Sequence, residues 1–173
     1  MTDALDWTYR VTDIPEGGLR ESRVATEAER ARLAEALDIR ACGRLLADFT
    51  IRAIGKGHYR LAGKLLAAVT QSCVVTLDPV EQSAEATFDV EFWPAGSLPE
   101  LGEEEVEVLS AAEIEAIEHG RIDAGRIVFE TLATSLDPYP RKAGAAFTPD
   151  TDEAAGGMEL GPFAALKKLK GRD

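Results

Sequence analysis

The stretch RACGRLLADFTIRAIGKGHYRLAGK, from Arg40 to Lys64, decides how this chain folds. Its six Lys and Arg residues all have even numbers, and apolar side chains fill many of the odd positions between them. Successive side chains of a β-strand point to opposite faces of a sheet, so this parity separates cations from apolar side chains. Gly55-Lys56-Gly57 interrupts the alternation and supplies two glycines that tolerate a positive φ angle. The stretch therefore predicts a β-hairpin with one basic and one apolar face.

Three further segments have the composition of strands. Trp7 to Val11 and Leu19 to Val24 are short and β-prone, and the turn cluster between them predicts that they pair with each other. Ala84 to Phe92 alternates between apolar and acidic residues, which predicts a strand with one buried face. A fourth strand around Glu105 to Leu109 would be an exposed edge protected by its charges.

Helices are indicated by capping signals. Thr26 and Glu29 have the spacing of a capping box, and Ser110 and Glu113 repeat that spacing before a short helix to about Glu118. Asp123 is a candidate cap for a longer helix. Several antiparallel strands flanked by helices predict an α+β fold whose sheet is strongly curled and barrel-like.

Length and composition predict one compact domain over residues 1–147. A flexible linker is expected over 148–160 and a short amphipathic C-terminal tail over 161–173, where Phe163, Leu166 and Leu169 oppose three lysines. The sequence contains neither a secretory signal nor an apolar run of about 20 residues, so we expect a cytoplasmic protein that does not contact a membrane.

The charges of this chain are separated along the sequence. The net charge is −12, and residues 65–120 hold thirteen Asp and Glu but no Lys or Arg. A net negative protein is a poor non-specific nucleic-acid coat, because such binding depends on cations that displace counterions from phosphate. The charge distribution instead points to two local surfaces, one basic and one acidic.

The sequence offers only weak candidates for catalysis, metal binding or a cofactor. His58 and His119 fit structural positions at a hairpin tip and at a helix end. Cys42 and Cys73 fit small buried residues, and their spacing from the two histidines matches no zinc motif. We therefore expect a protein that is not an enzyme and has no metal or cofactor.

Two binding hypotheses follow from the charges. The first is that the basic face of the hairpin contacts RNA phosphates, and its candidate residues are Arg44, Arg52, Lys56, Arg60 and Lys64. The second is that the acidic region receives a basic protein, through Glu81, Glu85, Asp89, Glu91, Glu103, Glu104, Glu105 and Glu107. A third hypothesis, a small-ligand barrel, rests only on the inferred sheet.

Four blocks of the chain resemble the YceD family, the large ribosomal RNA subunit accumulation proteins, in an alphaproteobacterial-type form. The blocks are Glu29 to Ala34, Gln71 to Val80, the segment from Ile122 to Arg141, and Gly161 to Lys170. Many members of that family have a second cysteine three residues after the first, but this chain has Thr76 there. A Cys-X-X-Cys role is therefore excluded, and Cys73 is expected to pack in the interior.

The resemblance implies a ribosome biogenesis factor that supports accumulation or processing of large-subunit (23S) rRNA. Its implied partners are that rRNA or a pre-ribosomal particle, and the alternative is an adaptor or chaperone for a basic ribosomal protein. The segment Asp137-Pro138-Tyr139-Pro140-Arg141 is interpreted as a rigid helix exit, with recognition by exposed Tyr139 and Arg141 as the alternative.

Overall fold

The structure is a computed structural model that describes residues 4–98 and 113–147. The chain divides into two units, Met1–Lys142 and Ala143–Asp173, and the account below concerns the first. The predicted linker 148–160 and tail 161–173 lie outside the described residues. No helix in the described part of the chain is both long and apolar enough to span a membrane.

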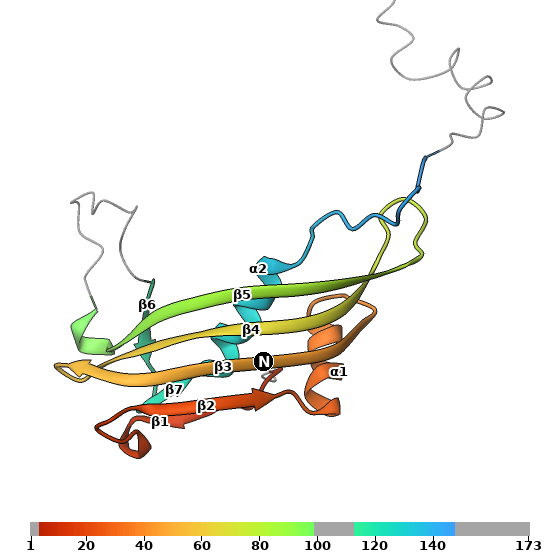
Figure 1. The fold of residues 1–173 in the computed structure, drawn as a ribbon. Helices are drawn as coiled ribbons and strands as arrows, with labels where there is room; N and C mark the ends of the chain where they lie inside the picture. Colours follow the sequence, from red (N-terminus) through yellow and green to blue (C-terminus); the bar gives the residue numbers. More distant parts are fainter. Residues whose placement is uncertain (1–3, 99–112, 148–173) are drawn as a thin grey trace, which may run out of the picture. The chain divides into compact units, whose positions relative to one another are not determined.

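A five-stranded sheet forms the centre of the first unit (Figure 1). Its strands, in spatial order, are β2 (Leu19–Val24), β3 (Ala41–Gly55), β4 (His58–Ser72), β5 (Pro79–Pro94) and β6 (Glu113–Ile117). The predicted hairpin is confirmed, because β3 and β4 pair antiparallel with Arg52 opposite Arg60 and Asp48 opposite Lys64. All three turn residues have positive φ angles, 96° at Gly55, 56° at Lys56 and 77° at Gly57.

The expected antiparallel, barrel-like sheet is wrong. Strand β6 runs parallel to β5, with Val90 opposite Glu113, so the sheet is mixed. The sheet is also open, since β2 and β6 are its two edges and do not pair with each other. Alternation in the sequence reveals strands and their faces, but helices supply the second layer here, so the sheet has no need to close on itself. The small-ligand barrel hypothesis rested on a closed sheet, so it is wrong as well.

A second, two-stranded sheet pairs β1 (Thr8–Arg10) with β7 (Arg121–Asp123). The expected pairing of Trp7 to Val11 with Leu19 to Val24 is therefore wrong, because β2 pairs with β3 instead. Residues 113–117 were expected in a short helix and form strand β6. The expected strand around Glu105 to Leu109 lies outside the described residues.

Two helices and two 3₁₀ turns complete the part of the unit that the structure describes. The α-helices are α1 (Glu27–Ala36) and α2 (Ala124–Ser135), and the 3₁₀ turns are η1 (Val11–Asp13) and η2 (Ala95–Ser97). The capping box of Thr26 and Glu29 is confirmed. Asp123 caps α2 as predicted, its carboxylate accepting a hydrogen bond from the Arg126 N–H at 2.9 Å.

Glu29 also joins α1 to the N-terminal segment. Its buried carboxylate accepts hydrogen bonds from the Trp7 indole N–H at 2.8 Å and from the Thr26 N–H at 2.8 Å. Burial alone would raise the pKa of Glu29, but hydrogen bonds from the Thr26 N–H and hydroxyl, the Asp6 N–H and the Trp7 indole together outweigh it and lower the pKa below the ordinary value. The carboxylate is therefore ionised at neutral pH and fully engaged as an acceptor.

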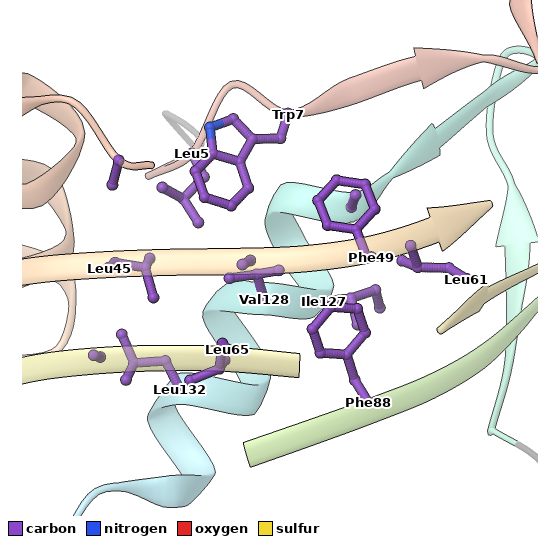
Figure 2. Packing of buried hydrophobic residues seen from close by; sticks show 14 of the residues in the cluster. Leu5, Trp7, Leu45, Phe49, Leu61, Leu65, Phe88, Ile127, Val128 and Leu132 are labelled. Atoms are coloured by element: carbon purple, nitrogen blue, oxygen red, sulfur yellow. The ribbon is translucent and has the colours of Figure 1, made fainter. Parts of the chain in front are cut away.

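The hydrophobic core lies on one face of the five-stranded sheet. Odd-numbered side chains of β3 and β4 pack there against even-numbered side chains of β5, together with α1, α2 and the N-terminal segment. Figure 2 shows Leu45, Phe49, Leu61, Leu65 and Phe88 of the sheet beside Ile127, Val128 and Leu132 of α2, with Leu5 and Trp7 nearby. Both α1 and α2 lie on this side, so no helix in the described part of the chain covers the opposite face of the sheet (Figure 1).

Gly63 lets two phenyl rings approach each other in the middle of this core. It lies between Phe49 of β3 and Phe88 of β5 in the strand register, and the two ring centroids are 6.4 Å apart. A Cβ atom at Gly63 would lie 2.4 Å from the Asp48 carbonyl oxygen and 2.5 Å from the Phe49 Cβ. Backbone atoms cannot move aside as a flexible side chain can, so only glycine fits this position.

We predict that Gly63→Ala lowers the free energy of unfolding by about 2–3 kcal/mol, because the added methyl group forces β3 and β4 apart. Gly43→Ala is the matched control in the same hairpin, since a Cβ there would meet the Ala68 carbonyl oxygen at an ordinary 3.5 Å. Urea denaturation of both variants checks the difference. Equal stabilities would contradict the close approach at Gly63.

Candidate functional site

The uncovered face of the five-stranded sheet carries most of the predicted binding residues. We call it the open face and define it by the even-numbered side chains of β2 and β4, those of β3 from Arg44 to Arg52, and the odd-numbered ones of β5. The core-facing neighbours of these residues are buried from Leu45 to Ile51 on β3, and on β5 they are buried from Ala84 to Phe92 except for the half-buried Ala86. Strand alternation therefore exposes this face as a direct consequence of burying the other.

The structure places the five predicted cations along the β3–β4 hairpin. Arg44 lies opposite Ala68, Lys64 opposite Asp48, and Arg52 opposite Arg60, while Lys56 occupies the turn. All five side chains are exposed. The parity argument is correct for the sheet, where Arg44, Arg52, Arg60 and Lys64 share the open face.

Arg60 already forms an ion pair with Asp89 on the neighbouring strand. Its guanidinium donates hydrogen bonds to both carboxylate oxygens of Asp89, one of them from Nε at 2.6 Å. This contact lowers the pKa of Asp89. The pair is about half exposed, so it contributes little to stability, but it neutralises one of the five predicted phosphate contacts.

The predicted acidic residues of β5 lie on the same open face. Glu81, Glu85, Asp89 and Glu91 alternate along one side of the strand, directly beside β4. Glu103, Glu104, Glu105 and Glu107 lie outside the described residues. The basic and acidic stretches, which are distinct in the sequence, are therefore adjacent strands of one surface over β3 to β5.

An apolar row crosses the middle of the open face. Val24, Leu46 and Leu66 are direct neighbours across β2, β3 and β4, and the row ends at Glu85 of β5. Val24 is 57% exposed and Leu66 39% exposed. A shallow hollow lies beside the row, where Ala68 and Ser83 have short side chains between Arg44 and Glu85. The open face thus combines charge with exposed hydrocarbon.

An aromatic pair at the hairpin end of the open face was missed by the sequence reasoning. The rings of His58 and Trp93 stack with centroids 4.3 Å apart and an interplanar angle of 13°. Trp93 Nε1 donates a hydrogen bond to Glu91 at 2.9 Å. Part of the signal was present in the sequence, since Trp93 directly follows the predicted strand Ala84 to Phe92 and His58 was already placed at the hairpin tip.

Cys73 lies near the opposite end of the sheet, where its sulfur accepts hydrogen bonds from two chain segments. Its buried Sγ accepts hydrogen bonds from the backbone N–H groups of Thr76 at 3.5 Å and Lys142 at 3.4 Å. The Lys142 N–H, followed by the contacts with Thr76, lowers the pKa of the Cys73 thiol to about 6, although burial acts in the opposite direction. Cys73 is therefore packed, and its sulfur is the acceptor that holds two chain segments together.

These contacts bring together two blocks that are far apart in the sequence. The N–H of Val74 donates to the carbonyl oxygen of Pro140 at 2.9 Å, and Lys142 forms an ion pair with Asp78 at 3.1 Å. Pro140 is buried in this junction. Tyr139, by contrast, is 72% exposed, and Arg141 is also exposed. The helix exit is thus anchored at Pro140 while it presents Tyr139 outward.

The described residues do not bring candidate metal ligands together. Within residues 4–98 and 113–147, no group of three His, Cys, Asp or Glu side chains is positioned to hold a metal ion. His119 has a positive φ of 49° in the turn between β6 and β7, not at a helix end as predicted.

The fold and the open face define a mixed-sheet protein that presents an uncovered, charged sheet surface. The family model described as large ribosomal RNA subunit accumulation protein YceD matches residues 61–170, which is more than half of the chain. The chain therefore belongs to the YceD family. Comparisons with curated proteins and with solved structures gave no match. The match includes β4 from Leu61 onward, β5, α2 and both segments of the Cys73 junction.

We predict that ionisation of Cys73 makes stability depend on pH. Because its folded pKa of about 6 lies below the ordinary value of 9.0, the unfolded state binds more protons between these values and stability rises with pH across that window. The stabilisation is lost as the pH falls through about 6. Thiolate absorbance during a pH titration and denaturation at several pH values check this.

Cys42 provides the matched control, because burial raises the pKa of its thiol. Cys73→Ser is expected to remove the thiolate signal near pH 6 and the extra pH dependence of unfolding, whereas Cys42→Ser keeps both. A thiolate signal that survives in Cys73→Ser would contradict the assignment.

Proposed function

We propose that this protein supports the accumulation of large-subunit (23S) rRNA by binding that rRNA, or a precursor particle that contains it, in the cytoplasm and without catalysing a reaction. The description of its family supports the general role. Direct RNA binding through the open face is our own addition. The argument rests on four cations of the open face and its hairpin turn that form no ion pair with a described residue.

The observation that carries the proposal is the exposure and the charge pairing of four cations, Arg44, Arg52, Lys56 and Lys64. Each is exposed, and none forms an ion pair with a residue that the structure describes. The eight steps along the chain from Arg44 to Arg52 cover roughly 26 Å of strand at about 3.3 Å per residue. Phosphates of a bound strand would thus meet several cations in succession.

The acids beside these cations limit how the surface binds. Asp89 neutralises Arg60, and Glu81 and Glu85 lie on the neighbouring strand. A uniformly basic surface would bind any nucleic acid, whereas this mixed surface repels phosphates that are out of register. The proposed binding is therefore modest in affinity and selective in position.

A second candidate function has its own supporting observation. The exposed apolar row of Val24, Leu46 and Leu66 gains nothing from a phosphate backbone, but it suits the centre of a protein interface. Glu81 and Glu85 would then face cations of the partner. Under this alternative the protein is an adaptor or chaperone for a basic ribosomal protein.

To test RNA binding, we replace two of the available cations in the variant Arg52→Gln/Lys64→Gln. Each lost contact lowers the dependence of log K on log salt by about 0.7–0.9, so the slope is expected to fall by about 1.4–1.8. Fluorescence anisotropy with large-subunit rRNA fragments at several salt concentrations provides the measurement. The matched control is Arg10→Gln/Arg121→Gln, which removes two exposed cations that are paired across the small sheet. An unchanged slope in the folded Arg52/Lys64 variant would rule out this phosphate surface.

The adaptor alternative is tested through the apolar row. The variant Val24→Ser/Leu66→Ser is expected to reduce capture of ribosomal proteins at low salt about tenfold, because two contacts lose their buried hydrocarbon. Val74→Ser is the control, since Val74 is 47% exposed but belongs to the Cys73 junction. If folded wild-type protein recovers no ribosomal protein, the adaptor hypothesis is wrong.

A further inference from the structure

The stacked rings of His58 and Trp93 form a small platform at the hairpin end of the open face. His58 is two residues before Arg60 on β4, and Trp93 is two residues after Glu91 on β5, so both rings are on the same side of the sheet as those charges. Both side chains are half-buried. The hydrogen bond from Trp93 Nε1 to Glu91 restricts rotation of the indole. The platform is thus an oriented aromatic surface with part of each ring accessible.

Cations surround this aromatic platform. Arg60 adjoins His58 along β4, Arg52 lies opposite Arg60 on β3, and Lys56 is in the turn two residues before His58. The turn lies close to the end of β5, because a Cβ atom at Gly57 would be 3.4 Å from Pro94 Cγ. Aromatic and cationic residues from three strands and one turn are therefore neighbours in the register at this end of the sheet.

Arg52 is the least compensated charge in this cluster. Two like charges directly opposite each other destabilise a strand pair, and Arg52 faces Arg60 in this way. Asp89 compensates Arg60, but Arg52 has no ion pair with any residue in the described part of the chain. Its aliphatic stem lies against Gly18, where a Cβ would be only 2.6 Å from the Arg52 Cγ. The stem is thus positioned by packing while the guanidinium remains available for an anion.

A nucleotide combines the two chemistries that this cluster offers. Its base stacks on an aromatic ring, and its phosphate accepts hydrogen bonds from guanidinium and ammonium groups. We infer that His58 and Trp93 stack with an unpaired base of single-stranded RNA, while Arg52 and Lys56 hold the adjacent phosphates. Bases within a duplex are already stacked on each other, so the ligand is a single-stranded segment. This inference rests on the proposed function and gives it a specific contact.

The experiment uses the intrinsic fluorescence of the full-length protein. The chain has two tryptophans, and Trp7 is 1% exposed, so a base stacking on the surface reports through Trp93. A uridine decamer is expected to quench the emission in a saturable manner. The quenching should be absent from Trp93→Phe, which retains only Trp7.

Two substitutions separate stacking from packing. Trp93→Leu keeps a large apolar side chain without an aromatic face, and its affinity for the decamer is expected to fall about tenfold. Trp93→Phe restores a ring and should bind within about threefold of the wild type. Tyr139→Leu, at an exposed aromatic residue of the Cys73 junction, is the matched control and should bind normally. If Trp93→Leu fails to fold, the quenching of the wild type and its absence from Trp93→Phe decide the question.

The outcomes distinguish this inference from the proposed function. If the decamer binds by anisotropy but Trp93 is not quenched and Trp93→Leu binds as tightly, the platform is overturned while RNA binding stands. If the wild type binds neither the decamer nor rRNA fragments, both ideas are wrong. Quenching by a basic ribosomal protein and not by RNA would overturn the inference and assign the platform to a protein partner.

Discussion

The structure depends on the fact that three long adjacent strands must bury one face. Each of β3, β4 and β5 has 15 or 16 residues, so alternation commits about half of their side chains to each side. Apolar residues take one set of positions, and α1, α2 and the N-terminal segment cover them. A shift of one residue in any register would expose the core side chains and bury charges, which fixes the pairing strongly. The composition of the open face follows from this register.

Charges that are separated in the sequence become neighbours on the open face. The cations of the hairpin and the acids of β5 belong to different stretches of the chain, but antiparallel pairing sets β4 beside β5. Arg60 and Asp89 consequently form a surface ion pair, and Lys64 lies opposite Asp48. A partner therefore meets alternating charges around an apolar row. Position along the strands, more than net charge, would therefore determine which partner fits this face.

Much of the local structure could be predicted because its causes are local. Alternation between Arg40 and Lys64 identified the hairpin, and the hydroxyl and carboxylate of Thr26 and Glu29 identified the start of α1. Strand partners could not be predicted in this way, since the pairing of β1 with β7 joins residues more than a hundred positions apart. The parallel strand β6 was missed because Glu113 suits a helix cap as well as an exposed strand. The aromatic pair was missed because the proximity of His58 and Trp93 depends on the β4–β5 register.

The length of β4 has a consequence for assembly. His58 and Ser72 are its two ends, and its 15 residues span roughly 50 Å at about 3.4 Å per residue. The aromatic platform is at one end, and the Cys73 junction with outward-facing Tyr139 is at the other. The two ends therefore offer two separate surfaces. If each end binds a different component, β4 would act as a spacer that holds the two components at a set separation.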